Sequence, residues 1–171
     1  MYPLFVLLLA LAFLPMALEA RLAAGHDRIL RSAGAAEPKD EVLPLMQLAY
    51  PAAFLAMAFE AWARRAKPNT VFFTGAVVFA IAKIIKYWAI ATLGERWTFR
   101  VLVPPDSSRI TSGPYRFMRH PNYLGVMGEL AGMALMAQAP IAGTLSMVIF
   151  GILIARRIRV EERALAGGNE R

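Results

Sequence analysis

Hydrophobic residues fall in five long runs separated by polar segments. The third run is about 23 residues long, enough for an α-helix to cross a bilayer at about 1.5 Å rise per residue. The last two runs are joined by only Gln138, Ala139 and Pro140, which leaves room for nothing but a tight helical hairpin. The pattern predicts an all-α protein, a polytopic membrane bundle of about five transmembrane helices in a single domain over residues 1–171. The expected spans are residues 2–18, 43–63, 71–93, 123–139 and 141–155.

Composition supports this interpretation. Hydrophobic residues make up 58% of the chain and the mean hydropathy is +0.48, more than a soluble core of this size can bury. The net charge of +7 comes from basic residues between the apolar runs, where they meet anionic lipid headgroups, so no nucleic-acid partner is expected. Because the chain has no cysteine, it has no disulfide, thiolate metal site or cysteine nucleophile, and we expect no metal.

The basic residues predict the orientation of the bundle. Most of them fall in the first loop, the third loop and the C-terminal tail, whereas the second loop holds only Arg64, Arg65 and Lys67. The positive-inside rule then puts the N-terminus outside and the C-terminus in the cytoplasm. We expect a multi-pass protein of a bacterial inner membrane, whose oligomeric state the sequence leaves open.

The richest segment lies between the third and fourth runs, residues 94–123. A loop of this length is usually functional or disordered, and its aromatic residues argue against disorder. Pro121 suits the first turn of a helix, so the fourth helix is expected to start there. Its free N–H groups favour an anion such as an amino-acid carboxylate, with His120, Asn122 and Tyr123 adding hydrogen bonds. The alternative is an aromatic and basic interface belt, which does not explain the sequence His-Pro-Asn.

The C-terminal tail is expected to continue the fifth helix beyond the membrane. Arg157 and Glu161 are one helical turn apart on one face. The simple interpretation is a solvated helix end with a weak ion pair. The functional one is that Glu161 or Glu162 faces a cationic cofactor while Arg157 holds an anionic substrate.

At these two segments the sequence resembles the isoprenylcysteine carboxyl methyltransferase family of membrane enzymes. The resemblance covers about the C-terminal half and rests on two motifs in order, Gly113-Pro-Tyr115 with Arg119-His-Pro-Asn-Tyr123, and Glu161-Glu-Arg-Ala-Leu165. The stretch from Lys86 to Gly94, with Trp97 and Arg100, looks more like a bacterial branch that methylates alkylpyrones and alkylresorcinols.

The resemblance implies an S-adenosylmethionine-dependent O-methyltransferase with a cytoplasmic cofactor-binding loop and C-terminal helix. The acceptor would be a lipophilic molecule, such as a prenylated cysteine or an alkylpyrone or alkylresorcinol, and Arg157 would contact it. The implied cofactor-binding residues are Ser107, Ser108, Arg109, Ile110, Tyr115, His120, Pro121, Asn122, Tyr123 and Glu161.

Three ionisable residues lie inside the predicted spans, where charges are functional candidates by default. Glu129 is two turns into the fourth span, and Lys83 and Lys86 are three apart in the third. A carboxylate acceptor needs no general base, whereas a phenol with a pKa near 10 would benefit from one, and His120 or Glu129 could serve. The alternatives are a Glu129 to Lys86 ion pair between helices and lysines that reach the interface.

Two other functions remain open. Membrane sterol and steroid reductases have a similar arginine-histidine-x-x-tyrosine segment and use NADPH, although the two glutamates of the tail favour a sulfonium over a 2′-phosphate. The other is a non-enzymatic membrane scaffold whose loop binds lipid or a partner.

Overall fold

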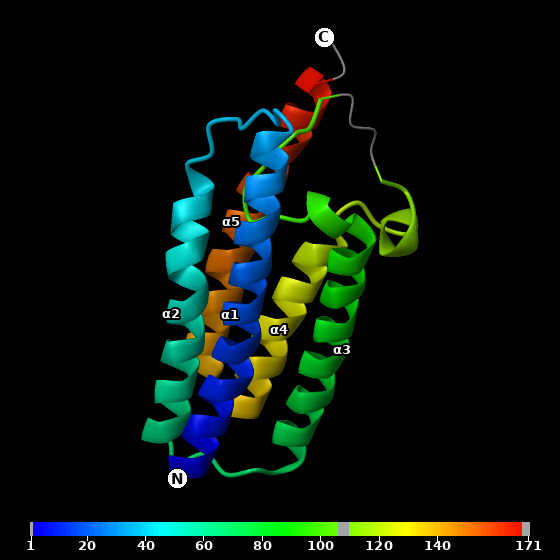
Figure 1. Cartoon of the computed structure of the whole chain (residues 1–171). Helices are drawn as coiled ribbons and strands as arrows, with labels where there is room; N and C mark the ends of the chain where they lie inside the picture. Colours follow the sequence, from blue (N-terminus) through cyan, green and yellow to red (C-terminus); the bar gives the residue numbers. More distant parts are fainter. Residues whose placement is uncertain (1, 106–109, 169–171) are drawn as a thin grey trace.

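The chain forms a bundle of long helices that run along one axis (Figure 1). The computed structural model describes residues 2–105 and 110–168. These form the five expected helices, α1 (Tyr2–Ser32), α2 (Val42–Ala63), α3 (Thr70–Leu93), α4 (Pro121–Ala137) and α5 (Pro140–Gly168), with two short 3-10 helices, η1 (Gly94–Arg96) and η2 (Gly113–Arg116).

The helices have the length and surface of a membrane bundle. Four of them, α1, α2, α3 and α5, are long and apolar enough to cross a bilayer, whereas α4 has 17 residues, at the lower limit for a span. Large apolar side chains face outward along them, among them Leu14, Leu48, Phe73, Ile84 and Leu145. A soluble monomer rarely exposes so much apolar surface, so lipid is the medium that covers it.

Helix ends follow the local sequence signals. α1 does not stop at residue 18 but continues as one helix to Ser32, because nothing in the polar stretch breaks it. Pro121 begins α4 as predicted, and this helix ends at Ala137 because Gln138 adopts a left-handed conformation. α5 runs without a break from the predicted hairpin into the C-terminal tail.

Three glycines let α4 lie against α3. A Cβ atom on Gly132 would come within 2.6 Å of the Phe79 backbone nitrogen, and one on Gly128 within 2.7 Å of the Ala82 Cβ. Gly125 meets Lys86 in the same way, at 2.8 Å from its Cβ. The absence of side chains at these positions lets the two helices pack closely.

We expect Gly132→Leu to destabilise the protein by about 1–3 kcal/mol or more, because the side chain has no space against α3. Gly151→Leu is the matched control, since a Cβ atom there meets nothing within 4 Å. Thermal unfolding in detergent measures both. Equal melting temperatures for the two variants would contradict the packing role.

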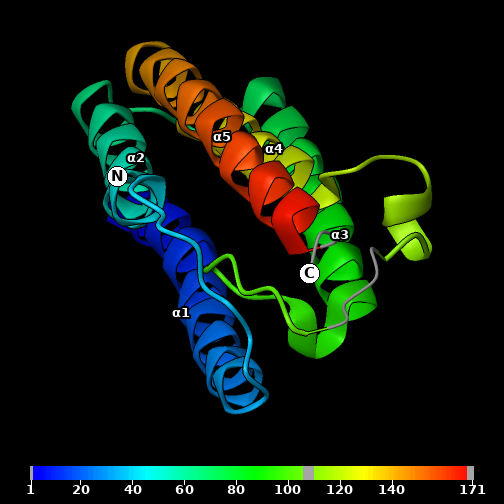
Figure 2. The same ribbon diagram turned by 90° about the horizontal axis from the view of Figure 1, so that it is seen from above.

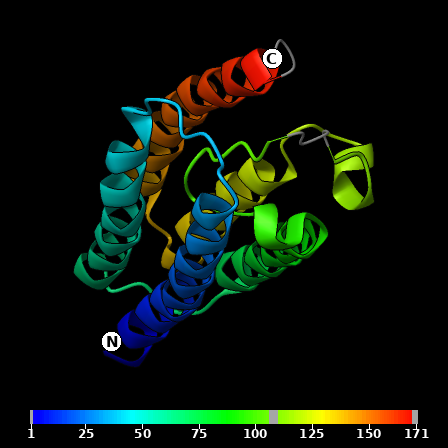
Figure 3. The same ribbon diagram turned by 45° about the horizontal axis from the view of Figure 1, so that its top comes forward.

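The first loop, the third loop and the end of α5 come together at one end of the bundle (Figures 1 and 2). The segment after η1, from Trp97 to Val103, crosses this end between α1 and α5 (Figure 3). We call it the crossing segment. Val103 pairs with Ala36 of the first loop through two backbone hydrogen bonds of 2.9 Å. His26 of α1 adds a 2.7 Å contact from its Nδ1 to the Trp97 carbonyl oxygen. We call this region the loop end of the bundle.

Candidate functional site

A cavity of about 500 Å³ opens at the loop end and reaches down between the helices. Its upper walls are the crossing segment, the start of α4 and the C-terminal part of α5 around Arg157 and Glu161. Its lower walls are mostly apolar side chains, such as Met16, Met46, Val126 and Phe150, with the polar Glu19, Tyr50 and Lys86 among them. The volume is in the range of small-molecule sites, and the mixed walls suit an amphiphilic ligand.

Glu161 is the centre of the polar contacts at the top of the cavity. The Tyr123 hydroxyl donates a hydrogen bond to its Oε1, and the Nε of Arg157 lies 3.5 Å from the same oxygen. The Nδ1 of His120 lies 3.5 Å from Oε2, while the His120 Nε2 faces Glu162 at 3.6 Å. The two motifs that the sequence separates by about 40 residues therefore meet in one place.

Two buried polar atoms at the start of α4 have no hydrogen bond within the protein. The Asn122 Oδ1 and the His120 Nε2 are buried and have no hydrogen bond, although both residues line the cavity. No side chain caps this helix, whose His120 N-cap is followed by Pro121. Buried polar atoms without partners are costly in a finished protein. These atoms are accounted for if a polar ligand binds beside them.

Arg157 connects α5 to the two loops. Its guanidinium donates to the Phe99 carbonyl oxygen and pairs with the carboxylate of Asp40. Asp40 also accepts hydrogen bonds from the backbone N–H groups of Val42 and Leu43, at 3.0 and 3.2 Å, and so caps α2. Arg157 lines the cavity and at the same time fixes its upper wall.

The charge of Glu161 changes the acidity of its neighbours. The pKa of His120 is raised, mainly by its hydrogen bond to Glu161 and further by the charges of Glu161 and Glu162, against the effect of burial. Burial, with the Glu161 charge second, raises the pKa of the Tyr115 hydroxyl well above its usual range. At neutral pH Tyr115 is therefore a neutral hydrogen-bond donor, and His120 keeps its imidazolium form to higher pH than a free histidine does.

A raised pKa in the folded state predicts a pH dependence for the His120 contact. Its stabilising contribution should be fully present below pH about 6.5, the value for an unfolded histidine, and be lost as pH rises through the higher folded value. The melting temperature of the unmodified protein should exceed that of His120→Gln by more at about pH 6 than at about pH 9. A gap that is the same at both pH values would contradict this pairing.

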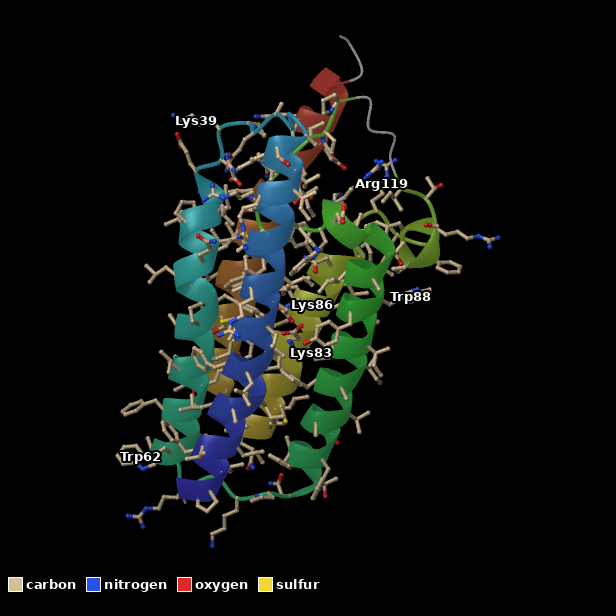
Figure 4. All side chains as sticks on the ribbon, in the orientation of Figure 1. Lys39, Trp62, Lys83, Lys86, Trp88 and Arg119 are labelled. Atoms are coloured by element: carbon tan, nitrogen blue, oxygen red, sulfur yellow. The ribbon has the colours of Figure 1, made fainter. Side chains whose placement is uncertain are left out.

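Below the loop end, four charged side chains from three helices form a buried cluster. Lys86 contacts Glu19 Oε2 at 2.6 Å and Glu129 Oε1 at 3.2 Å. Lys83 contacts Glu19 Oε1 at 3.0 Å and Glu129 Oε2 at 2.9 Å. Figure 4 shows both lysines pointing into the bundle from α3, whereas Trp88 points away from it. The Glu129 to Lys86 ion pair considered from the sequence is present.

The remaining residues singled out from the sequence have different places. Ile110, Tyr115, His120, Asn122, Tyr123, Arg157 and Glu161 all line the cavity. Pro121 is buried beside them as the first residue of α4. Glu129 is buried and does not line the cavity. Tyr50 does line the cavity, and its hydroxyl donates a hydrogen bond to Glu129 Oε2 at 2.7 Å. Ser107, Ser108 and Arg109 lie outside the described residues.

Sequence reasoning missed Glu19, Asp40 and Tyr50. Glu19 ends an apolar run and Asp40 lies in a charged loop, so both had the appearance of solvated interface residues. Glu19 is in fact only 3% exposed. One signal was present: a span with two lysines and another with one glutamate leave one positive charge unbalanced, which calls for a second carboxylate at membrane depth.

Two bacterial proteins are similar to this chain over nearly its full length. The YpbQ protein of Bacillus subtilis is 30% identical over 161 residues, which cover 94% of this chain and 96% of YpbQ. A Haemophilus influenzae protein is 27% identical over 163 residues, or 95% and 92% of the two chains. Protein-S-isoprenylcysteine O-methyltransferase A of Arabidopsis thaliana is 30% identical over 90 residues, which is 52% of this chain and 46% of the plant protein.

No solved structure matches the chain. The sequence pattern of the isoprenylcysteine carboxyl methyltransferase (ICMT) family matches residues 74–167, from α3 through both motifs at the top of the cavity. With a membrane bundle, a cavity built from those two motifs and this match over more than half of its length, the chain belongs to the ICMT family.

Proposed function

We propose that the protein is a membrane methyltransferase that uses S-adenosylmethionine to methylate an oxygen atom of a lipophilic acceptor. The observation that carries this proposal is the meeting of Glu161 with His120 and Tyr123 at the top of a largely apolar cavity that Asn122 also lines. Family membership and the Arabidopsis relative that is named as an O-methyltransferase support it.

The residues at the top of the cavity fit the cofactor. Glu161 supplies a carboxylate for a cationic group, and the buried Asn122 Oδ1 is an acceptor that lacks a donor. The start of α4 and a protonated His120 favour the amino-acid carboxylate. Tyr115, Tyr123, Pro121 and Ile110 complete the proposed pocket. When bound, the cofactor supplies the methyl group from its sulfonium.

The chain's own residues then have to align the acceptor and exclude water. The apolar lower walls suit the hydrocarbon part of an acceptor that enters from the bilayer. Arg157 lines the cavity and pairs with Asp40, and its proposed role is to contact the acceptor's polar part. Of the two candidate bases, His120 is less suited, because its raised pKa favours the protonated form, which cannot accept a proton.

The proposed orientation puts the loop end in the cytoplasm, where the cofactor is made. The three segments rich in arginine and lysine meet at this end, and Arg64, Arg65 and Lys67 lie in the turn at the opposite end (Figure 1). The positive-inside rule then favours a cytoplasmic site. A bacterial inner membrane remains the proposed location.

Transfer of a labelled methyl group tests the proposal. Purified protein in lipid nanodiscs is incubated with methyl-labelled S-adenosylmethionine and a set of lipophilic acids and phenols, and the products are extracted into organic solvent. Label should appear in a methyl ether or ester. Reduction of a sterol double bond with NADPH, without methyl transfer, would support the reductase instead; family membership does not favour that outcome.

A further inference from the structure

An exposed turn at the loop end takes no part in the cavity. It consists of Arg116, Phe117 and Met118, none of which lines the cavity, and we call these three residues the outer turn. Phe117 is 74% exposed, more than any other large apolar side chain in the described part of the chain. Single exposed apolar side chains are common on proteins, so the position of this one decides what it contacts.

The backbone fixes the outer turn beside the end of α3. Gly113, whose φ of +54° is left-handed, packs on Thr92 of α3, where a Cβ atom would come within 2.9 Å of the Thr92 Cγ2. The backbone N–H groups of Phe117 and Met118 then donate to the Pro114 carbonyl oxygen at 3.1 and 3.2 Å. Figures 1 and 2 show η2 on the side of α3 that faces away from α1 and α2. The outer turn therefore projects on the lipid-facing side of the bundle.

The length of α3 gives the depth of the outer turn in the membrane. α3 has 24 residues, which corresponds to about 36 Å, longer than the hydrocarbon core of about 30 Å. Trp88 lies one helical turn before Thr92 and points away from the bundle (Figure 4), as aromatic side chains do at a membrane–water interface. The last turns of α3, and the outer turn beside them, therefore lie at the level of the lipid headgroups.

The chemistry of the outer turn combines an aromatic ring with a positive charge. The Arg116 guanidinium lies over the Phe117 ring, 6.0 Å from its centroid, and no carboxylate of the described residues pairs with it. Arg119 differs, because it lies 3.8 Å from Glu162 and lines the cavity. At headgroup depth, an aromatic ring suits the boundary of the acyl chains, and a guanidinium suits a phosphate oxygen. A negatively charged surface also attracts the arginine.

We propose that the outer turn binds an anionic phospholipid of the leaflet at the loop end and thereby holds the segment that carries Tyr115. Tyr115 precedes Arg116 directly and lines the cavity. One short 3-10 helix thus presents a side chain to the candidate site, and the residues that follow contact the membrane. The lipid contact is independent of which cofactor and acceptor the cavity takes.

Photo-crosslinking to lipid tests the contact. Benzoylphenylalanine, a photoreactive analogue of phenylalanine, replaces Phe117 in one variant and Ile84 in another; Ile84 is an exposed residue on α3 and serves as the control for contact with lipid in general. Both proteins are irradiated in nanodiscs of equal phosphatidylglycerol and phosphatidylcholine, and the adducts are identified by mass. The ratio of anionic to zwitterionic adducts should be about fivefold higher at position 117. Lipid adducts at 84 but not at 117, or the same ratio at both positions, would overturn the proposal.

Arg116→Gln removes the charge while keeping most of the side-chain length. In the protein labelled at position 117 it should lower the adduct ratio to the value at position 84, whereas Lys67→Gln, at the opposite end of the bundle, should leave the ratio unchanged. A ratio that Arg116→Gln does not change would overturn the role of the guanidinium.

Hydrogen exchange tests whether the lipid holds the segment. The backbone amides of residues 113–118 should exchange about threefold more slowly in nanodiscs that contain phosphatidylglycerol than in phosphatidylcholine alone, because the bound lipid opposes local opening. Arg116→Gln should remove this difference. Equal exchange of the unmodified protein in the two lipids would overturn the holding effect.

Discussion

Replacing Glu161 by alanine should weaken S-adenosylmethionine binding about 100-fold while the protein stays folded in the membrane. Glu161 is the common partner of Tyr123, His120 and Arg157, and a charge-assisted hydrogen bond in a partly buried site contributes about 1.5–3 kcal/mol. Each 1.4 kcal/mol changes a dissociation constant tenfold. Isothermal titration calorimetry on protein in nanodiscs measures the change.

Glu162→Ala is the matched control for this variant. Glu162 has the same charge and lies on the same helix, but its side chain is 46% exposed and does not line the cavity. We expect its removal to change cofactor affinity less than about threefold, as for an exposed ion pair. If the two alanine variants bind the cofactor equally well, the placement of the cofactor beside Glu161 is wrong.

The second large effect is on stability. Lys86→Met should lower the free energy of unfolding by about 3–5 kcal/mol, because Glu19 and Glu129 are then left with Lys83 alone. Thermal unfolding in detergent should show a fall in melting temperature well beyond that of a surface substitution.

A second substitution separates charge from packing in this result. Lys86→Met combined with Glu129→Gln restores the balance of one carboxylate and one ammonium in the cluster, so it should recover part of the loss. If the double variant is as unstable as the sum of the two single variants, the lysine stabilises through its packing, and the account of the cluster as a balanced ion network fails.

Periodicity and length made the helices predictable. Apolar runs long enough for a bilayer gave five helices, and Pro121 gave the start of α4 because proline fits a first turn. The continuation of α5 into the tail was expected. The end of α1 was less accessible, since a helix that leaves the membrane loses its apolar signal while keeping its backbone hydrogen bonds. The length of α1, to Ser32, is therefore a structural result.

The candidate site was predictable where its residues are close in sequence. His120, Asn122 and Tyr123 surround one helix start, and Arg157 and Glu161 share one helix face. Glu19 and Tyr50 contact residues 67 and 79 positions away, and such pairings depend on how the helices are arranged. The crossing segment from Trp97 to Val103 is similar, because its position is set by contacts with α1 and the first loop.

The central claim is that the two motifs form one site for S-adenosylmethionine. Titration of the purified, unmodified protein with S-adenosylmethionine and, separately, with NADPH tests it most directly. We predict saturable binding of S-adenosylmethionine, lost in Glu161→Ala and retained in Glu162→Ala, with no saturable binding of NADPH. Saturable binding of NADPH without binding of S-adenosylmethionine would contradict the account.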